Sequence, residues 1–179
     1  MQMSLLMGNR PLPVQNSNYS DDRTESQVSP SITMTNGIIC NEKVVLGIGV
    51  GFEMFDRNLF PVFLDIRRTL WDNKVSPFFS VKIGYAFSGF KKKHYDNLSL
   101  SHAPHYVSDV YYKKNGGFLL NPEIGVKLPF NENTDLLFTV GYRLQKVQST
   151  VSQNFGSHQK WEYKANFNRL SFGVALMFR

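Results

Sequence analysis

The strongest constraint on this chain is a two-residue alternation of bulky apolar residues with small or polar ones, repeated from residue 31 to the end. Successive side chains of a β-strand point to opposite faces, so this period predicts strands. None of the segments carries apolar residues at the spacing of an amphipathic helix. The predicted strands are 31–39, 44–55, 60–71, 78–90, 117–130, 136–149 and 161–178. The alternation therefore predicts an all-β fold.

The composition of the second face of each strand distinguishes two architectures. In the segment 78–90, one face carries Phe79, Val81 and Ile83, while the other carries Lys82 and Gly84. A soluble sandwich or a lipocalin-like barrel would bury the bulky face and expose the other to water. A membrane barrel would turn the bulky face to lipid and the small, polar face to a narrow lumen. The abundance of glycine on the second face favours the membrane barrel, because water-facing strand positions rarely use glycine.

Charges of both signs lie on the same face as the glycines. Inside a narrow lumen such residues would have to pair, because an unpaired buried charge is costly. We therefore expect a structural network of paired charges that packs the lumen. Its predicted members are Glu53, Asp65, Arg67, Lys82, Glu123, Lys127, Arg143 and Arg169.

Length and hydropathy agree with strands and exclude membrane helices. The longest apolar or glycine run covers residues 44–52 of the 179, well below the ~18 residues that a spanning helix needs. A spanning β-strand needs only ~9–11 residues. The mean hydropathy of −0.26 is the average of an apolar face, a polar face and hydrophilic loops. A modest average is thus compatible with a protein of the bilayer.

The predicted connections alternate in length. Residues 40–43, 72–76 and 131–135 form short turns, whereas 91–116 and 150–160 are long. The connection 56–59 is a short member of the second set. Bacterial outer-membrane barrels pair short periplasmic turns with longer external loops. Aromatic residues also gather near the strand ends, as interfacial girdles do.

Several short motifs carry a resemblance to a known family. They are GIGVGF at 47–52, PVFLDIR at 61–67, PFFSVKIGY at 77–85, GGFLLNPEIG at 116–125, VGYR at 140–143 and LSFGVALMFR at 170–179. In this order the chain resembles the small outer-membrane β-barrel proteins of Gram-negative, Bacteroides-type bacteria. The resemblance implies an antiparallel up-and-down barrel in the bacterial outer membrane, acting as a monomer. It implies as partners the membrane lipid, lipopolysaccharide and the assembly machinery, which would read Phe178 as its C-terminal signal.

Two features depart from that pattern. Seven predicted strands conflict with the even number of single-chain bacterial barrels, so we expect eight strands with the first one truncated or atypical. The polar segment 1–30 would then be a remnant of this strand plus an external loop, and 31–179 would be the barrel domain. The start of the chain lacks the basic and apolar regions of a signal peptide, which we expect to be missing from this sequence. Pro122 would interrupt a strand, and a bulge is expected there.

Three more specific functional hypotheses have only weak support in the sequence. Lys91, Lys92 and Lys93 in the long connection could contact lipopolysaccharide phosphates, and a solvated loop is the plainer reading. A lipid A-modifying enzyme would need a pair among Ser99, Ser101, His102 and His158, whose spacing selects none. A histidine metal site around 94–109 lacks a second ligand pair at the usual spacing. We assign no catalytic, cofactor or metal residue, and we expect no nucleic-acid partner.

The sequence therefore predicts an outer-membrane barrel with a non-enzymatic role in envelope structure or surface display. The alternative is a soluble lipocalin-like barrel that binds an apolar ligand. That alternative predicts that Val50, Phe52, Phe138 and Phe172 point inward. A lipid A-modifying barrel enzyme is the third hypothesis.

Overall fold

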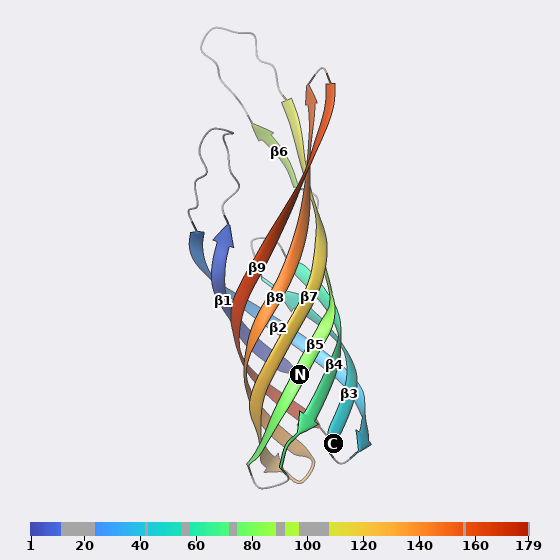
Figure 1. Ribbon diagram of the computed structural model, residues 1–179, viewed down its shortest axis with the longest axis vertical. Helices are drawn as coiled ribbons and strands as arrows, with labels where there is room; N and C mark the ends of the chain where they lie inside the picture. The colour runs from blue at the N-terminus through green and yellow to red at the C-terminus, as the bar shows by residue number, and fades with distance from the viewer. Residues whose placement is uncertain are drawn as a thin grey trace.

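The computed structural model describes most of the chain (Figure 1). The backbone is described for residues 1–11, 24–41, 43–54, 58–71, 75–88, 92–96, 108–155 and 157–178. Side chains are described for residues 1–8, 27–41, 43–54, 58–71, 75–88, 116–146 and 166–178. No described residue belongs to a helix that is long and apolar enough to cross a membrane.

The described backbone is almost entirely β-strand. The strands are β1 (Gln2–Pro11), β2 (Thr24–Asn41), β3 (Val44–Glu53), β4 (Leu59–Thr69), β5 (Ser76–Ser88), β6 (Lys92–Asp96), β7 (Ser108–Asn131), β8 (Thr134–Phe155) and β9 (Ser157–Phe178). Every pairing between them is antiparallel. Strand β6 pairs only with β7, and the other eight strands form a closed ring through the β1–β9 and β5–β7 pairings. The prediction of an all-β, eight-stranded antiparallel barrel is confirmed.

The first strand of the ring differs from the sequence prediction. The sequence pattern leaves only residues 1–8 for it, whereas β1 has ten residues and pairs with both β2 and β9. Its partner β2 begins at Thr24 and not at residue 31, so that part of the predicted external loop is strand. Residues 1–8 do alternate, with Met3, Leu5 and Met7 on the exposed face, but the polar residues after Gly8 and before residue 31 hid the rest of β1 and the start of β2.

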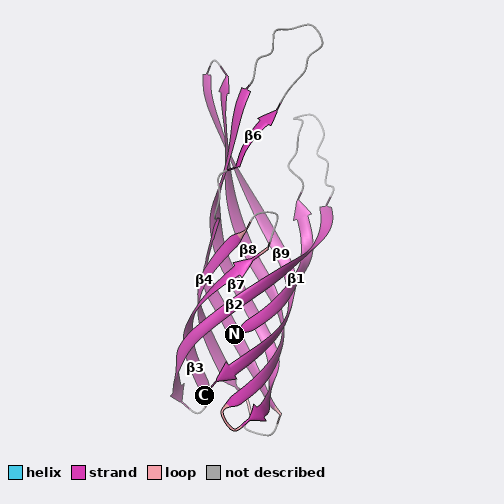
Figure 2. Cartoon of the chain, turned by 180° about the vertical axis from the view of Figure 1, so that it is seen from behind, coloured by secondary structure: helices cyan, strands magenta, loops and turns pink. Residues whose placement is uncertain are grey.

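The strands β7, β8 and β9 extend well beyond the rest of the barrel, together with β6 (Figure 2). The prediction of a long loop at 150–160 is wrong, because the β8–β9 ladder continues to the pair Phe155 and Ser157. Residues 108–116, also predicted as loop, belong to β7. These segments carry polar residues on both faces, which hid them from a reading based on apolar alternation.

Gly116 marks the point where β7 leaves β5. Its φ of +80° lies in the left-handed region that favours glycine, and a register shift separates Lys114 from Gly116 in the β7–β8 ladder. Below this point β7 pairs with β5, starting at the Gly117–Ala86 pair. Beyond it β7 pairs with β6. The glycine therefore lets the long strand bend out of the ring.

The bulge expected at Pro122 is absent. The β5–β7 register runs without a shift through the Val81–Pro122 pair. On the β8 side the ladder skips Asn121 and Pro122 and resumes at Glu123 in the same register. Because proline has no N–H to donate, the strand omits local pairings and needs no extra residue.

We call the end of the barrel that holds the C-terminus the lower end (Figure 1). The β2–β3 hairpin closes there at the Asn41–Val44 pair, and the β7–β8 hairpin closes at the Asn131–Thr134 pair. The long β7–β9 extension leaves from the opposite, upper end. Short connections thus lie at the lower end, as the sequence predicts.

Candidate functional site

The outer face of the barrel is apolar. Val50, Phe138 and Phe172 are 55%, 42% and 43% exposed and point outward, whereas Gly49 is buried and faces the lumen. The soluble alternative predicts the opposite orientation for these residues. Their outward placement contradicts the prediction that the soluble, lipocalin-like barrel makes for them.

The distribution of side chains is inverted relative to a soluble protein. Among the described residues, eighteen polar or charged side chains are buried and only nine hydrophobic ones. Large hydrophobic side chains on every barrel strand are exposed. Soluble monomers rarely expose contiguous apolar patches larger than a few hundred Å². We therefore expect the outer face of this barrel to contact an apolar environment.

Glycines on β3 make room for large side chains in the lumen. A Cβ on Gly49 would fall on ring atoms Cε2 and Cζ of Phe63, which reaches over from β4. The Lys82 ammonium lies 5.9 Å from the centroid of the same ring. Glycine at this position therefore lets an aromatic ring of one strand cover its neighbour and wall off a buried cation.

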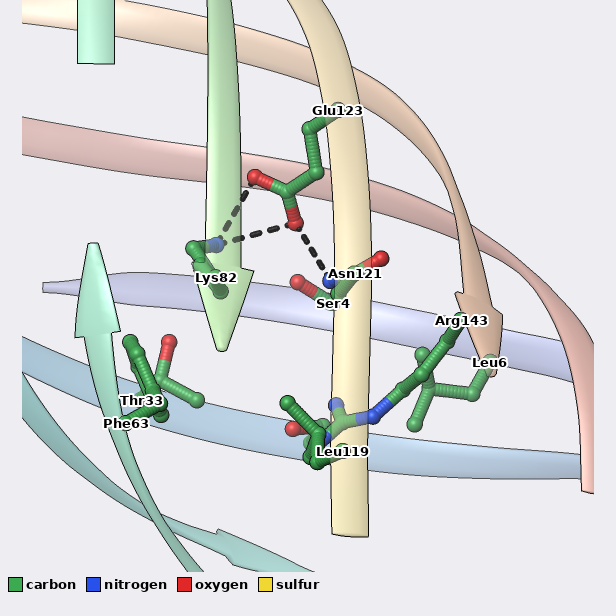
Figure 3. Close-up of a pocket in the computed structure, with 10 residues that line it drawn as sticks. Ser4, Leu6, Thr33, Phe63, Lys82, Leu119, Asn121, Glu123 and Arg143 are labelled. Carbon is green, nitrogen blue, oxygen red and sulfur yellow. Dashed lines mark hydrogen bonds and ion pairs between the residues drawn. The ribbon is translucent and has the colours of Figure 1, made fainter. Parts of the chain in front are cut away.

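The middle of the lumen holds a fully partnered ion pair (Figure 3). The Lys82 Nζ lies 2.9 and 2.8 Å from the two carboxylate oxygens of Glu123 and donates to Gln2 Oε1 at 2.6 Å. Asn121 Nδ2 donates to Glu123 Oε1 at 2.8 Å. Gln2 Nε2 donates in turn to Thr139 Oγ1 at 3.1 Å. Four strands therefore meet in one buried network, which we call the middle cluster.

A second cluster, the upper cluster, joins β3, β8 and β9. Glu53 forms ion pairs with Arg143 and with Arg169, whose Nη2 lies 3.5 Å from Glu53 Oε2. Arg169 also donates to Gln145 Oε1. All four side chains are at most 4% exposed. One carboxylate thus connects two guanidinium groups across the barrel.

A third cluster, the lower cluster, lies toward the lower end. Arg67 Nη2 donates to Asp65 Oδ2 at 3.1 Å, and Ser80 Oγ donates to Asp65 Oδ1 at 2.8 Å. The guanidinium also lies 5.0 Å from the centroid of the Phe78 ring and contacts Met177 Sδ at 3.8 Å. The Arg67 side chain is 13% exposed. This pair is therefore closer to solvent than the other two.

Apolar groups pack the lumen between the clusters, next to a small cavity. One apolar group contains Leu59, Phe63, Ala86, Leu119 and Phe167, and another contains Phe78, Leu137 and Ala175. A cavity of about 10 Å³ lies between the middle and upper clusters, next to Lys82 and Arg143. This volume accommodates about one water molecule. The described lumen therefore has the character of a packed core.

The structure places seven of the eight predicted network residues in these clusters. Lys127, the eighth, is half-buried on the inward face of β7 and belongs to none of the three clusters. The sequence prediction missed the uncharged members Gln2, Asn121, Thr139 and Gln145. All four lie on the inward parity of their strands, which was the available signal. Phe178 ends β9 and is 71% exposed.

Several sequence candidates fall outside the described residues or side chains. Lys91, Ser99, Ser101 and His102 lie outside the described backbone. The side chains of Lys92, Lys93 and His158 lie in strands but outside the described side chains. The described residues contain no group of three or more metal-ligating side chains. The lipopolysaccharide, enzyme and metal readings of these residues are therefore untested.

Comparison with known proteins gives a structural likeness but no match in sequence. No protein-family model matches the chain, and no curated protein matches it. The crystal structure of Neisserial surface protein A aligns with 99% of this chain and 95% of its own, at 14% identity and a TM-score of 0.48. An origin in Bacteroides-type bacteria stays a prediction from the sequence motifs. The protein is a closed eight-stranded antiparallel barrel with an apolar outer face and a packed lumen that contains charged side chains.

Proposed function

We propose that this protein is an integral outer-membrane β-barrel with a non-enzymatic role in envelope structure or surface display. One observation carries the proposal: the apolar side chains face out around the closed ring while ion pairs fill the lumen. Only closed barrels and helices can span a bilayer, because every backbone polar group must find a partner inside the protein. The β1–β9 pairing closes this ring.

The packed lumen supports a structural role over conduction. Eight-stranded barrels have an interior just wide enough for side chains to fill. Here the ion pair between Arg143 and Glu53 joins opposite strands across the lumen. The Lys82–Glu123 pair lies between the adjacent strands β5 and β7, and Lys82 reaches across to Gln2 on β1. The cavity between the two pairs has room for about one water. Solute passage would require these buried pairs to separate, which is costly.

The projecting strands support surface display. In bacterial barrels the short turns face the periplasm and the longer connections face outward. With that orientation, β7, β8 and β9 carry their extension away from the cell, together with β6, which begins with Lys92 and Lys93 (Figure 2). Lys91 precedes them in the sequence and lies outside the described residues. Contact of these lysines with lipopolysaccharide phosphates is part of the proposal, as is reading of Phe178 by the assembly machinery.

The test is whether the protein folds as a membrane barrel. The full chain is extracted in detergent, reconstituted into phospholipid vesicles, and run on denaturing gels with and without boiling. We expect carbonate-resistant vesicle association and faster migration of the unboiled sample. A water-soluble protein without a heat-dependent shift would contradict the proposal.

A further inference from the structure

Arg68 is an unusual residue on the outer face. It lies on β4 between the outward-facing Ile66 and Leu70, which are 46% and 47% exposed. It is itself exposed, and its cross-strand neighbours are Val44 and Phe79. Among the described strand residues that face outward, the only other charged one is Lys146, at the upper end of the apolar band.

The Arg68 guanidinium has no partner among the described residues. Its side chain makes no hydrogen bond or ion pair in the described part of the chain, in contrast to the lumen arginines. A charge on the lipid side of a barrel destabilises it by an amount that falls to ~0–1 kcal/mol near the interface. A long side chain can also extend along apolar surface to bring its charge to the headgroup level. At the headgroup level, the phosphate of a lipid can supply the partner that the described part of the protein does not.

Two further residues indicate that Arg68 lies at the depth of the lipid headgroups. Lys43 lies in the adjacent β2–β3 turn, is exposed, and also has no side-chain partner among the described residues. Its carbonyl oxygen accepts a hydrogen bond of 2.7 Å from the N–H of Thr69, directly after Arg68. Trp71, two residues further along, is 64% exposed. Tryptophan is enriched at membrane interfaces, where its ring sits among the headgroups.

We propose that Arg68 and Lys43, beside Trp71, form a binding site for the phosphate of an anionic phospholipid at the lower rim of the barrel. The inference rests on the proposed function, which places this rim in the periplasmic leaflet. The planar guanidinium binds a phosphate through two parallel hydrogen bonds, and the Lys43 ammonium adds a point charge. The acyl chains lie on the apolar surface above, which includes Ile66 and Phe79.

Native mass spectrometry tests the site on the full chain, folded in detergent and titrated with phosphatidylglycerol or phosphatidylcholine. A basic side chain near an anionic surface contributes about 1 kcal/mol, which corresponds to about a five-fold change in affinity. We expect Arg68→Gln and Lys43→Gln each to weaken phosphatidylglycerol retention about five-fold, with a larger loss in the double variant. Phosphatidylcholine should be retained less well by the wild type and change little in the variants.

Lys146 provides the matched control, because it faces outward and is exposed at the upper end of the apolar band, beyond Leu144. Lys146→Gln should leave this retention unchanged, and millimolar inorganic phosphate should not displace the lipid. Equal losses in Lys146→Gln and Arg68→Gln would show binding by net charge and overturn the proposal. Displacement by inorganic phosphate, or unchanged retention in Arg68→Gln, would also overturn it. Vesicle insertion of the wild type is scored separately, so that failure of this site and failure of the membrane proposal are distinct results.

Discussion

Two ion pairs in the same lumen are built in different ways. The Lys82–Glu123 pair of the middle cluster is at most 5% exposed, and Gln2 and Asn121 occupy its remaining hydrogen-bonding positions. The Arg67–Asp65 pair of the lower cluster is 13% exposed at the arginine, and Arg67 Nε has no partner in the described structure. The fully buried pair has complete partners, and the pair near the lower end does not.

The difference follows from the availability of water. Far from solvent, a missing hydrogen bond costs the full desolvation of the group, so that each polar atom of the middle cluster requires a protein partner. Near the lower opening, water can contact the exposed part of the Arg67 side chain and screen its pair with Asp65, although Arg67 Nε itself is buried. The two pairs should therefore respond differently to loss of one partner, to repacking and to salt.

The largest effect is expected from breaking the middle pair. Lys82→Met leaves the Glu123 carboxylate buried without its cation, which should lower the free energy of unfolding by about 3–5 kcal/mol. Urea unfolding and refolding of the barrel in detergent measures this. A loss below about 1 kcal/mol would mean that the middle cluster is hydrated like the lower one.

The double variant Lys82→Met/Glu123→Gln is the control. Removing both charges removes the uncompensated carboxylate, and the amide oxygen that replaces it can still accept from Asn121. We expect the double variant to be more stable than Lys82→Met alone, since replacing both partners of a buried pair is often neutral. Additive losses in this cycle would show that the two residues do not interact.

A smaller effect is expected from the wall that shields the middle pair. Gly49→Ala places a Cβ on the Phe63 ring, and such overpacking costs about 1–3 kcal/mol. Phe63→Leu in the same chain should recover part of the loss by removing the ring atoms that clash. Unfolding curves of the two single variants and the double variant measure this. If Phe63→Leu gave no recovery, the close packing of these two strands would be refuted.

The lower pair should be less sensitive. Asp65→Asn removes the charge but keeps an oxygen that can accept from Ser80 and Arg67. Because the arginine is partly solvated, we expect a loss of about 1 kcal/mol or less in the same unfolding assay. A loss as large as that of Lys82→Met would remove the distinction between the two pairs.

The smallest effect is expected from salt. Raising the ionic strength shortens the Debye length and weakens exposed pairs more than buried ones. The coupling energy of Arg67 and Asp65 should fall by a few tenths of a kcal/mol, while that of Lys82 and Glu123 stays constant. Double-mutant cycles at low and high salt measure both. Equal salt dependence of the two pairs would contradict the proposed difference in solvation.

The sequence predicts the barrel wall well, because alternation reports directly on which side of a strand a residue lies. It places Glu53, Lys82 and Arg143 on the inward face, where the structure has them. It does not predict which cation meets which carboxylate. That depends on the register between strands distant in sequence, such as β5 and β7.

Polar segments are where prediction from sequence fails. The start of β2, the end of β8 and the start of β9 lack a continuous apolar face, so that only their ladder partners identify them as strand. Strand β1 has an apolar face over residues 1–8, and only its continuation to Pro11 is hidden from the alternation. The contact between Gln2 and Lys82 could not be predicted either. It forms only because β1 pairs with both β2 and β9 and so closes the ring. The position of Arg68 in the apolar band could be read from the alternation, but its lack of a partner could not.

The central claim is that the bulky face of the strands meets lipid. It is tested most directly with one tryptophan at position 138, in a chain where Trp71 and Trp161 are replaced by Phe. In Phe138→Trp reconstituted into vesicles, we predict strong quenching of the fluorescence by brominated acyl chains and little quenching by aqueous iodide. Quenching by iodide, with none by brominated lipid, would contradict the membrane barrel.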